Sequence, residues 1–392
     1  MRRQVAMVVA IGLFYHMSSS AAKILVPLHI ASEGASVGAI GIVLAAHPLL
    51  PIFLSIPAGA LADRFGFRTM TMLGASGMVF AAGLLFLSSG LGSVLIAQML
   101  LGLGELLVWL SAQALATNLG PPEARVKNLG YFGFAIALAQ TIGPGTAGVL
   151  ADSVGFKNAF LMCLALSLLT LLSAIALPTT RPDRAKVPPM RDQIRASFTL
   201  AGRPRTRAAL LCTFTMILTR AVRRSFFPVF LMQSGYAASS IGFLVSLAEG
   251  SSTVVRGLLG KLLNYMTEDQ MVVAGMLVGV VATSLTPVLP NTALLALASV
   301  IAGVGLGLNL PLTMALIAGD APEHLRGVAM GLRLTSNRAA QLATPIIFGV
   351  VGNWLSLGAT FYVVGIPLLT GVGLTSVLLK RSRQCTRPAS AT

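Results

Sequence analysis

The chain repeats itself at an offset of 201 residues, without a gap, over most of its length. Most of the matched positions are Gly or Pro, which fix the shape of a backbone more than they add hydrophobicity. An ungapped repeat of such residues predicts two copies of one backbone plan. The matched residues are Pro27 with Pro228, Gly34 with Gly235, Gly41 with Gly242, Gly59 with Gly260, Gly74 with Gly275, Gly102 with Gly303, Gly104 with Gly305, Pro121 with Pro322, Gln140 with Gln341, Pro144 with Pro345, and Gly148 with Gly349.

The composition is typical of a chain that lies in a lipid bilayer. Hydrophobic residues make up 55% of the sequence and charged residues 10%, whereas soluble domains carry roughly 25% charged residues. The net charge of +16 lies mostly in short loops between apolar runs, where it favours a membrane orientation over a nucleic-acid partner. Cys163, Cys212 and Cys385 are far apart and imply neither a disulfide framework nor a metal site.

Twelve apolar runs are long enough to cross a bilayer as helices, which takes about 20 residues each. The first run has no clear cleavage site and is interpreted as an uncleaved span rather than a signal peptide. We therefore predict an all-α membrane protein with twelve transmembrane helices. The runs cover residues 5–30, 37–62, 69–89, 93–118, 128–150, 157–178, 208–232, 239–262, 270–289, 292–318, 327–351 and 358–379.

One long polar stretch, residues 181–207, separates six runs from the other six and contains eight Lys or Arg. This pattern predicts an N-terminal six-helix lobe over residues 1–180, a basic linker over 181–207, and a C-terminal six-helix lobe with a basic tail over 208–392. Because the repeat offset maps each span onto one of the same direction, the lobes are expected to be parallel repeats related by an axis along the membrane normal.

The basic residues are confined to alternate loops. Those loops contain Arg2, Arg3, Arg64, Arg68, Arg125, Lys127, the 181–207 stretch, Lys261, Arg326, Lys380, Arg381, Arg383 and Arg387. The intervening loops contain only Lys157. This asymmetry predicts a plasma (inner) membrane protein with both termini and the linker in the cytoplasm.

The loop after the second span carries a recognisable pattern. Gly59, Leu61, Asp63, Arg64, Gly66 and Arg68 match G-x-L-a-D-R-x-G-R/K-R/K, and Phe67 departs from it. Together with twelve spans in parallel halves, this loop resembles that of the major facilitator superfamily. The resemblance implies that Asp63, with Arg64 and Arg68 beside it, stabilises an outward-facing state at the interface between lobes. The alternative is a plain positive-inside loop.

The fifth span contains a second pattern, in which small residues allow close helix packing and a proline bends the helix. Gly143, Pro144 and Gly148 resemble the superfamily's antiporter signature, which implies the drug:proton antiporter branch. A generic kinked helix is an equally weighted alternative. The fourth span departs from that branch, because Gln98 stands where the branch has an arginine before G-x-G.

Charged and polar residues inside predicted spans need a function or a partner, because burying a charge in the bilayer costs at least about 2.5 kcal/mol. The candidates for proton coupling are Glu105 and Glu249, with His16 and His47 as weaker ones, since a buried carboxyl can exchange a proton near neutral pH. The candidates for a substrate cavity are Lys23, Arg220, Arg224, Arg338, Gln140, Gln341 and Asn309.

Lys23 and Arg224 occupy equivalent positions in the repeat and could clamp an anion. The alternative is salt bridging, in which Glu105 pairs with Lys23 and Glu249 pairs with Arg220 or Arg338. Asn309 and Pro311 are expected to break the tenth span.

These features predict a secondary transporter that works by alternating access rather than an enzyme, without cofactor or metal. The leading hypothesis is proton-coupled export of a small organic solute, for which an organic anion is one candidate. The alternative is uptake or exchange of an organic anion through a positively charged cavity. The expected partners are the solute, protons or a counter-substrate, and the lipid bilayer, with no nucleic acid, and the protein is expected to be a monomer.

Overall fold

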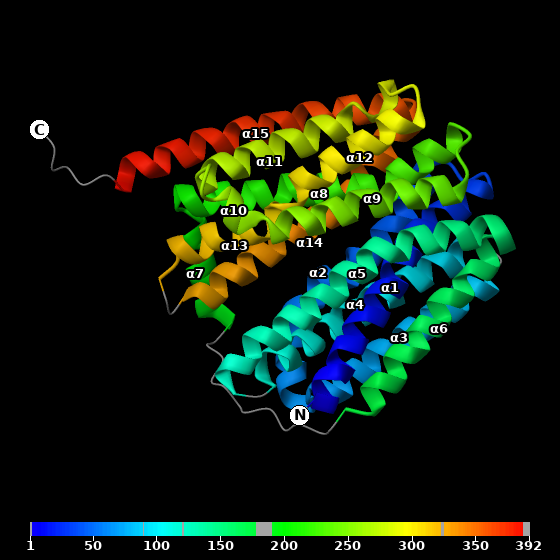
Figure 1. The fold of residues 1–392 in the computed structure, drawn as a ribbon, viewed down its shortest axis with the longest axis horizontal. Coiled ribbons are helices and arrows are strands. Elements are labelled where there is room, and N and C mark those ends of the chain that lie inside the picture. The colour runs from blue at the N-terminus through cyan, green and yellow to red at the C-terminus, as the bar shows by residue number, and fades with distance from the viewer. Residues whose placement is uncertain (1, 89, 120, 178–189, 323–324, 387–392) are drawn as a thin grey trace, which may run out of the picture. The chain divides into compact units, whose positions relative to one another are not determined.

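The computed structural model describes residues 2–88, 90–119, 121–177, 190–322 and 325–386, and no strand occurs within these ranges. The all-α prediction is therefore confirmed (Figure 1). The first half contains α1 (Arg2–Ser32), α2 (Val37–Phe65), α3 (Phe67–Leu87), α4 (Leu91–Asn118), α5 (Pro122–Val154) and α6 (Phe156–Ile175). The second contains α7 (Met190–Ala201), α8 (Pro204–Gln233), α9 (Ala238–Gly257), α10 (Leu259–Leu262), α11 (Glu268–Ser284), the 3-10 turn η1 (Thr286–Val288), α12 (Thr292–Gly307), α13 (Asn309–Asp320), α14 (Arg326–Trp354) and α15 (Leu357–Thr386).

Each predicted span contains a long helix, and nine segments of the described chain are both long and apolar enough to cross a membrane. The other three predicted spans correspond to α8, α11 and α14. Helix α11 has only 17 residues, and α8 and α14 each carry several arginines. The tenth span is interrupted as expected, since α12 ends at Gly307 and α13 begins at Asn309.

The sequence repeat is also a repeat of helix boundaries. Four helices of the first half begin 201 residues before their counterparts. The paired starts are Val37 with Ala238, Phe67 with Glu268, Leu91 with Thr292, and Phe156 with Leu357. The turn before the second helix of each half also repeats, because Gly34 and Gly235 have φ angles of 81° and 85°. A left-handed backbone of this kind favours glycine.

Contacts divide the chain into two compact units. The first contains residues 1–185, 224–246 and 345–353, and the second contains 186–223, 247–344 and 354–392. The first unit thus joins α1–α6 to parts of α8, α9 and α14. The predicted linker lies partly outside the described residues, and the predicted lobe boundaries stay a prediction.

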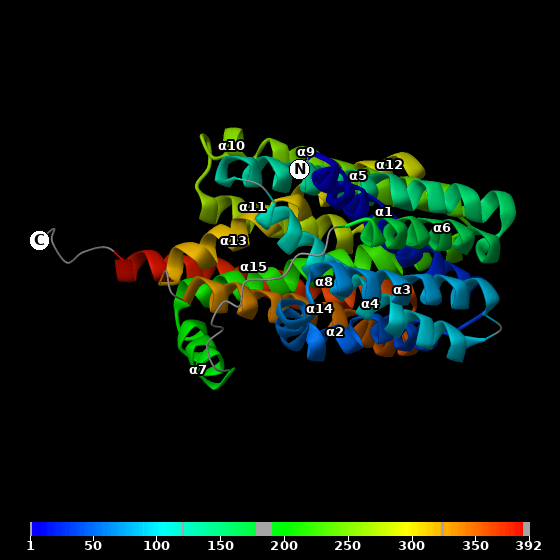
Figure 2. The same ribbon diagram turned by 90° about the horizontal axis from the view of Figure 1, so that it is seen from below.

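Within the first unit, α1 packs on α4, α5 and α6, and α4 also packs on α2 and α3. Helices α1, α5 and α6 run side by side in both views (Figure 1, Figure 2). In the second unit, α11 packs on α12 and α15.

Two very close helix contacts are made at glycines that occupy equivalent positions in the repeat. A side chain at Gly102 on α4 would overlap the carbonyl of His47 on α2, and one at Gly303 on α12 would overlap the carbonyl of Ala248 on α9. Small residues let membrane helices approach to backbone contact, where dispersion forces and weak hydrogen bonds hold them together. The same contact therefore positions α2 against α4 and α9 against α12.

This packing predicts a clear difference between two Gly→Ala substitutions. Gly102→Ala should destabilise the protein by about 1–3 kcal/mol, because the added methyl group has to displace the His47 backbone. Gly83→Ala on α3 is the matched control, since a methyl group there meets nothing within 4 Å. Thermal unfolding in detergent measures both. Equal melting temperatures for the two variants would contradict the proposed role of the Gly102 contact.

Candidate functional site

Three polar side chains of the first unit meet around the buried carboxylate of Glu105. We call these four residues the Glu105 cluster: Ser19, Lys23, His47 and Glu105. Lys23 Nζ lies 2.9 Å from Glu105 Oε2, and His47 Nε2 lies 3.3 Å from Glu105 Oε1. Ser19 donates its hydroxyl to Glu105 Oε1 and accepts a 2.8 Å hydrogen bond from Lys23. Both carboxylate oxygens are therefore held by donors.

Helix geometry explains how the chain builds this cluster. Ser19 and Lys23 are four residues apart on α1 and so lie on one face. Their face packs against α4, which carries Glu105. The Gly102 contact holds the His47 segment of α2 against α4, one turn before Glu105. Of the two alternatives left open for Lys23, the structure thus shows its ion pair with Glu105.

The cluster balances a charge that is largely buried in the protein. The side chain of Glu105 is 14% exposed and that of His47 is 11% exposed, whereas Lys23 is 30% exposed. A buried carboxylate needs a cation and hydrogen-bond donors to offset its lost hydration. Protonation of Glu105 would remove the charge that Lys23 and His47 bind, so the arrangement can link proton binding to a local rearrangement.

His16 lies apart from the ion pairs, in an aromatic group. Its ring centroid is 4.2 Å from that of Tyr15 and 5.7 Å from that of Trp109, and Trp109 stacks on Phe132 at 6.2 Å. The sequence analysis found His16 but missed the three aromatic residues. A signal for Trp109 was present, because it follows Glu105 by four residues on α4 and so shares its helix face.

In the second unit, the buried arginines bind groups of the protein itself. Arg220 lies 3.7 Å from Glu249 and donates to the carbonyl of Leu306 at 2.9 Å. Arg223, which is 4% exposed, donates to Ser299 at 2.7 Å. The Arg220–Glu249 pair is one of the salt bridges that the sequence left open.

The Ser19–Glu105 hydrogen bond has a counterpart in the repeat. Arg220 occupies the position equivalent to Ser19, and Leu306 occupies the position equivalent to Glu105. Both pairs are hydrogen-bonded, the first between side chains and the second from a guanidinium to a carbonyl. Each half therefore joins an equivalent pair of helices, α1 with α4 and α8 with α12, at equivalent positions but through different groups.

The other cavity candidates are dispersed. Arg338 donates to Gln341 at 3.3 Å, and Gln341 donates to Asn337 at 2.5 Å, all on α14. Asn309 is buried and contacts Cys212 of α8. Gln140 and Arg224 are half-buried on α5 and α8. The anion clamp of Lys23 and Arg224 stays a prediction.

The residues of the predicted switch loop are only partly described. Gly59, Asp63 and Arg64 belong to α2, but their side chains lie outside the described part of the chain. Gly66 precedes α3 with a φ of 87°, and Arg68 donates to the carbonyl of Ile175 at 2.8 Å. The role of Asp63 therefore stays a prediction.

The α5 signature forms the second close contact of the first unit. Gly143 packs on Ser20 of α1, and the carbonyl of Pro144 abuts Gly242 of α9. Gly148 abuts the carbonyl of Ala238, also on α9. These contacts leave no room for a larger residue at Gly143 or Gly148 of α5.

The same contact occurs again at the equivalent positions of the repeat. Gly41 of α2 abuts the carbonyl of Pro345 and the backbone of Gly349 on α14. Gly41, Pro345 and Gly349 are the counterparts of Gly242, Pro144 and Gly148. The kinked glycine helix of each half therefore packs on the second helix of the other half.

Asp152 closes the α5–α9 contact at one end, and the sequence analysis missed it. Its two carboxylate oxygens accept hydrogen bonds from the backbone N–H groups of Ala238 and Ser239 at 3.0 and 2.8 Å. These groups begin α9, where helix geometry leaves N–H donors without partners and favours a negative charge. Its counterpart, Asn353, lies beside Gly38 at the start of α2.

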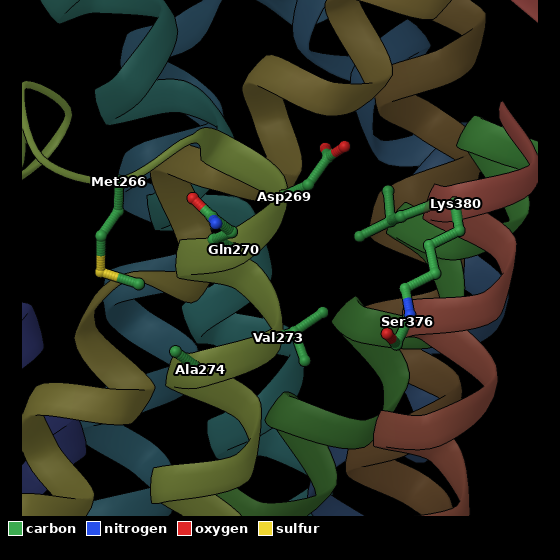
Figure 3. A pocket seen from close by; sticks show the side chains of 8 residues that line it. Met266, Asp269, Gln270, Val273, Ala274, Ser376 and Lys380 are labelled. Carbon is green, nitrogen blue, oxygen red and sulfur yellow. The ribbon is translucent and has the colours of Figure 1, made fainter. Parts of the chain in front are cut away.

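A separate pocket of about 370 Å³ lies in the second unit between α11 and α15. Figure 3 shows Gln270 and Val273 of α11 on one side and Ser376 and Lys380 of α15 on the other. It shares no residue with the Glu105 cluster. Among the described residues, no three His, Cys, Asp or Glu side chains are placed to hold a metal ion.

Comparison with known proteins gives consistent similarities. The sequence model of a family described as Major Facilitator Superfamily matches residues 8–283 and 209–391. An uncharacterized MFS-type transporter of Methanocaldococcus jannaschii is 23% identical over 86% of this chain and 88% of its own length. Multidrug resistance protein 2 of Bacillus subtilis is 21% identical over 86% of this chain and 85% of its own length.

Solved structures show the same fold. A POT family transporter in complex with 5-aminolevulinic acid superposes with a TM-score of 0.80 at 14% identity, covering 98% of this chain and 97% of the other. A bacterial homolog of the human lysosomal transporter Spinster gives a TM-score of 0.75 at 14% identity, covering 99% and 98% of the two chains.

The Asp152 geometry predicts a local effect of its removal. Asp152→Ala should destabilise the protein by about 1 kcal/mol, as loss of a helix cap does, and should speed hydrogen exchange at the amides of Ala238 and Ser239. Asp152→Asn should have a smaller effect, because one acceptor oxygen remains. Ser153→Ala is the control, since Ser153 bonds only within α5. Unchanged exchange at both amides in Asp152→Ala would refute the cap.

Proposed function

The chain belongs to the Major Facilitator Superfamily, and from this premise we propose that it exports a small organic solute in exchange for protons. Members of this family are multi-pass membrane proteins and secondary transporters, not enzymes, and so is this chain. We propose the coupling ion, the direction of transport and the kind of solute.

The observation that carries the proposal is the Glu105 cluster. Glu105 is a carboxylate at membrane depth whose partners, Lys23 and His47, come from two other helices. When Glu105 binds a proton, the attraction between these three helices weakens. When it releases the proton, the attraction returns, and the packing of α1, α2 and α4 responds to the same proton.

Exchange requires that the proton and the solute not be bound at once. A solute that donates a hydrogen bond to Glu105 binds the ionised carboxylate more strongly than the neutral acid, so a proton on Glu105 weakens that bond. Competition at one carboxylate is enough to make the two fluxes opposite. The side chain of Lys23 is 30% exposed, so the cluster has an accessible edge where such a solute can compete.

The α5 signature and the curated relatives support the export direction. Gly143, Pro144 and Gly148 form close helix contacts, as expected of a helix that must hold one closed state of an alternating-access cycle. Three of the similar proteins are named multidrug resistance proteins, two from Bacillus subtilis and one from Enterobacter lignolyticus. Asp63, with Arg64 and Arg68, is proposed to stabilise the opposite state.

The loop charges support an orientation with both termini in the cytoplasm of a plasma membrane. In that orientation, the end of α5 that carries Asp152 faces outward. We propose that the Asp152 cap and the paired glycine contacts hold the outer side closed, and that the protein works as a monomer.

Uptake of an organic anion is the alternative, and the buried cations bear on it. Lys23 is paired with Glu105, and Arg220 is paired with Glu249. Arg223 binds Ser299, so much of the cationic hydrogen-bonding capacity is directed to the protein itself. These contacts favour the proton-coupled proposal.

Neutralising Glu105 should uncouple transport from the proton gradient. In vesicles with an imposed pH gradient, screened against a panel of fluorescent organic solutes, Glu105→Gln should lose gradient-driven accumulation. It should keep solute exchange between equal pH values, because the amide still accepts a hydrogen bond but binds no proton.

Glu33→Gln is the control carboxyl for this experiment, because Glu33 is 52% exposed at the end of α1. Gradient-driven transport should persist in this variant. Full gradient-driven transport by Glu105→Gln would remove Glu105 from the coupling mechanism. If transport by the unmodified protein does not depend on the pH gradient but requires a counter-solute, the result would favour the exchange alternative.

A further inference from the structure

We propose that His16 and Trp109 form a stacking site for a neutral, planar aromatic solute that carries a hydrogen-bond donor, such as a phenol or an aromatic amine. This inference rests on the proposed function and specifies its substrate class. The site joins the Glu105 cluster along one surface of the first unit.

The His16 and Trp109 rings pack against aromatic neighbours. Trp109 and Phe132 stack with an interplanar angle of 29°, and His16 meets Trp109 edge-on at 81°. Tyr15 and Phe132 are each 1% exposed, so they fix their neighbours from within the protein. His16 and Trp109 are only half-buried, unlike Tyr15 and Phe132.

The aromatic pair is continuous with the Glu105 carboxylate. On α1, His16, Ser19 and Lys23 follow one another at intervals of three and four residues and therefore share a helix face. On α4, Glu105 and Trp109 are four residues apart and share another. Because α1 and α4 pack together, the aromatic pair and the Glu105 cluster form one wall. His16 and Lys23 are separated by about 10 Å along α1, which is the scale of a fused tricyclic ring system.

The net charge of the cluster bears on the kind of solute. The Glu105 carboxylate is already matched by the Lys23 ammonium, and His47 and Ser19 add hydrogen bonds. The ion pair has no net charge, so it favours neither a lipophilic cation nor an organic anion. It does offer a carboxylate acceptor. A neutral ring system with a donor group can therefore stack on Trp109 and bond Glu105, and a proton on Glu105 would weaken that bond.

The chain contains two tryptophans, which makes the site directly observable. Trp354 is 85% exposed at the end of α14, so Trp354→Phe leaves Trp109 as the only reporter. Three planar tricyclic probes then differ mainly in charge: aminoanthracene is neutral with a donor, aminoacridine is a cation, and anthracene carboxylate is an anion. Aminoanthracene should quench Trp109 saturably and bind most tightly of the three.

Substitution at His16 tests the stacking partner. In the Trp354→Phe background, His16→Ala should weaken aminoanthracene binding about three- to tenfold, the worth of one aromatic pair. His16→Phe keeps a ring and should bind within about threefold of the parent. An unshifted Trp109 emission maximum in the ligand-free variants shows that the site remains folded.

Two outcomes would overturn the inference: no saturable quenching by aminoanthracene, or equal affinities in the His16→Ala and His16→Phe variants. Tighter binding of aminoacridine or anthracene carboxylate would overturn the assigned charge class. These results are separable from failure of the proposed function. Gradient-driven transport of other solutes without aminoanthracene binding refutes only this site, whereas saturable binding without any proton-dependent flux refutes the export mechanism.

Discussion

The backbone contact between helices at repeated glycines is the constraint on which the rest of the structure depends. In lipid, apolar side chains gain little by leaving their surroundings, so helices associate through close packing and polar contacts. Gly102 brings the backbone of α4 onto the carbonyl of His47, and Gly303 brings α12 onto the carbonyl of Ala248. The first of these contacts also sets His47 near Glu105. A scaffold contact therefore positions a side chain of the Glu105 cluster.

That scaffold is two-fold, but its chemistry is one-sided. Ser19 and Arg220 are equivalent positions, and each reaches the equivalent site on the fourth helix of its half. In the first half that site is the carboxylate of Glu105, which can gain or lose a proton. In the second half it is the carbonyl of Leu306, which cannot. The repeat supplies one geometry, and only one of its copies carries a titratable group there.

The sequence predicted much of the fold because its signals are local. Gly and Pro at a fixed offset located equivalent helix starts, and the break near Asn309 followed from Pro311. The candidate site was harder to predict from the sequence. Glu105 was found from its depth, but its choice of Lys23 and His47 depends on three helices packing together. Asp152 was missed because a carboxylate near a helix end is ordinary until the N-terminus of α9 lies against it.

The polar contacts of Asp152 and of Glu105, both in the first unit, differ in what they can do. Asp152 is exposed and accepts hydrogen bonds from two backbone N–H groups, which keep the same charge at any physiological pH, so it fixes the start of α9. Glu105 is largely buried and bonds side chains from separate helices, so a change in its charge alters helix packing. A transporter needs both kinds of contact, because a closed state must hold and must also yield to a specific event. Their separation in the fold suits the proposed division of tasks, since the Asp152 contact with α9 shares no group with the Glu105 cluster.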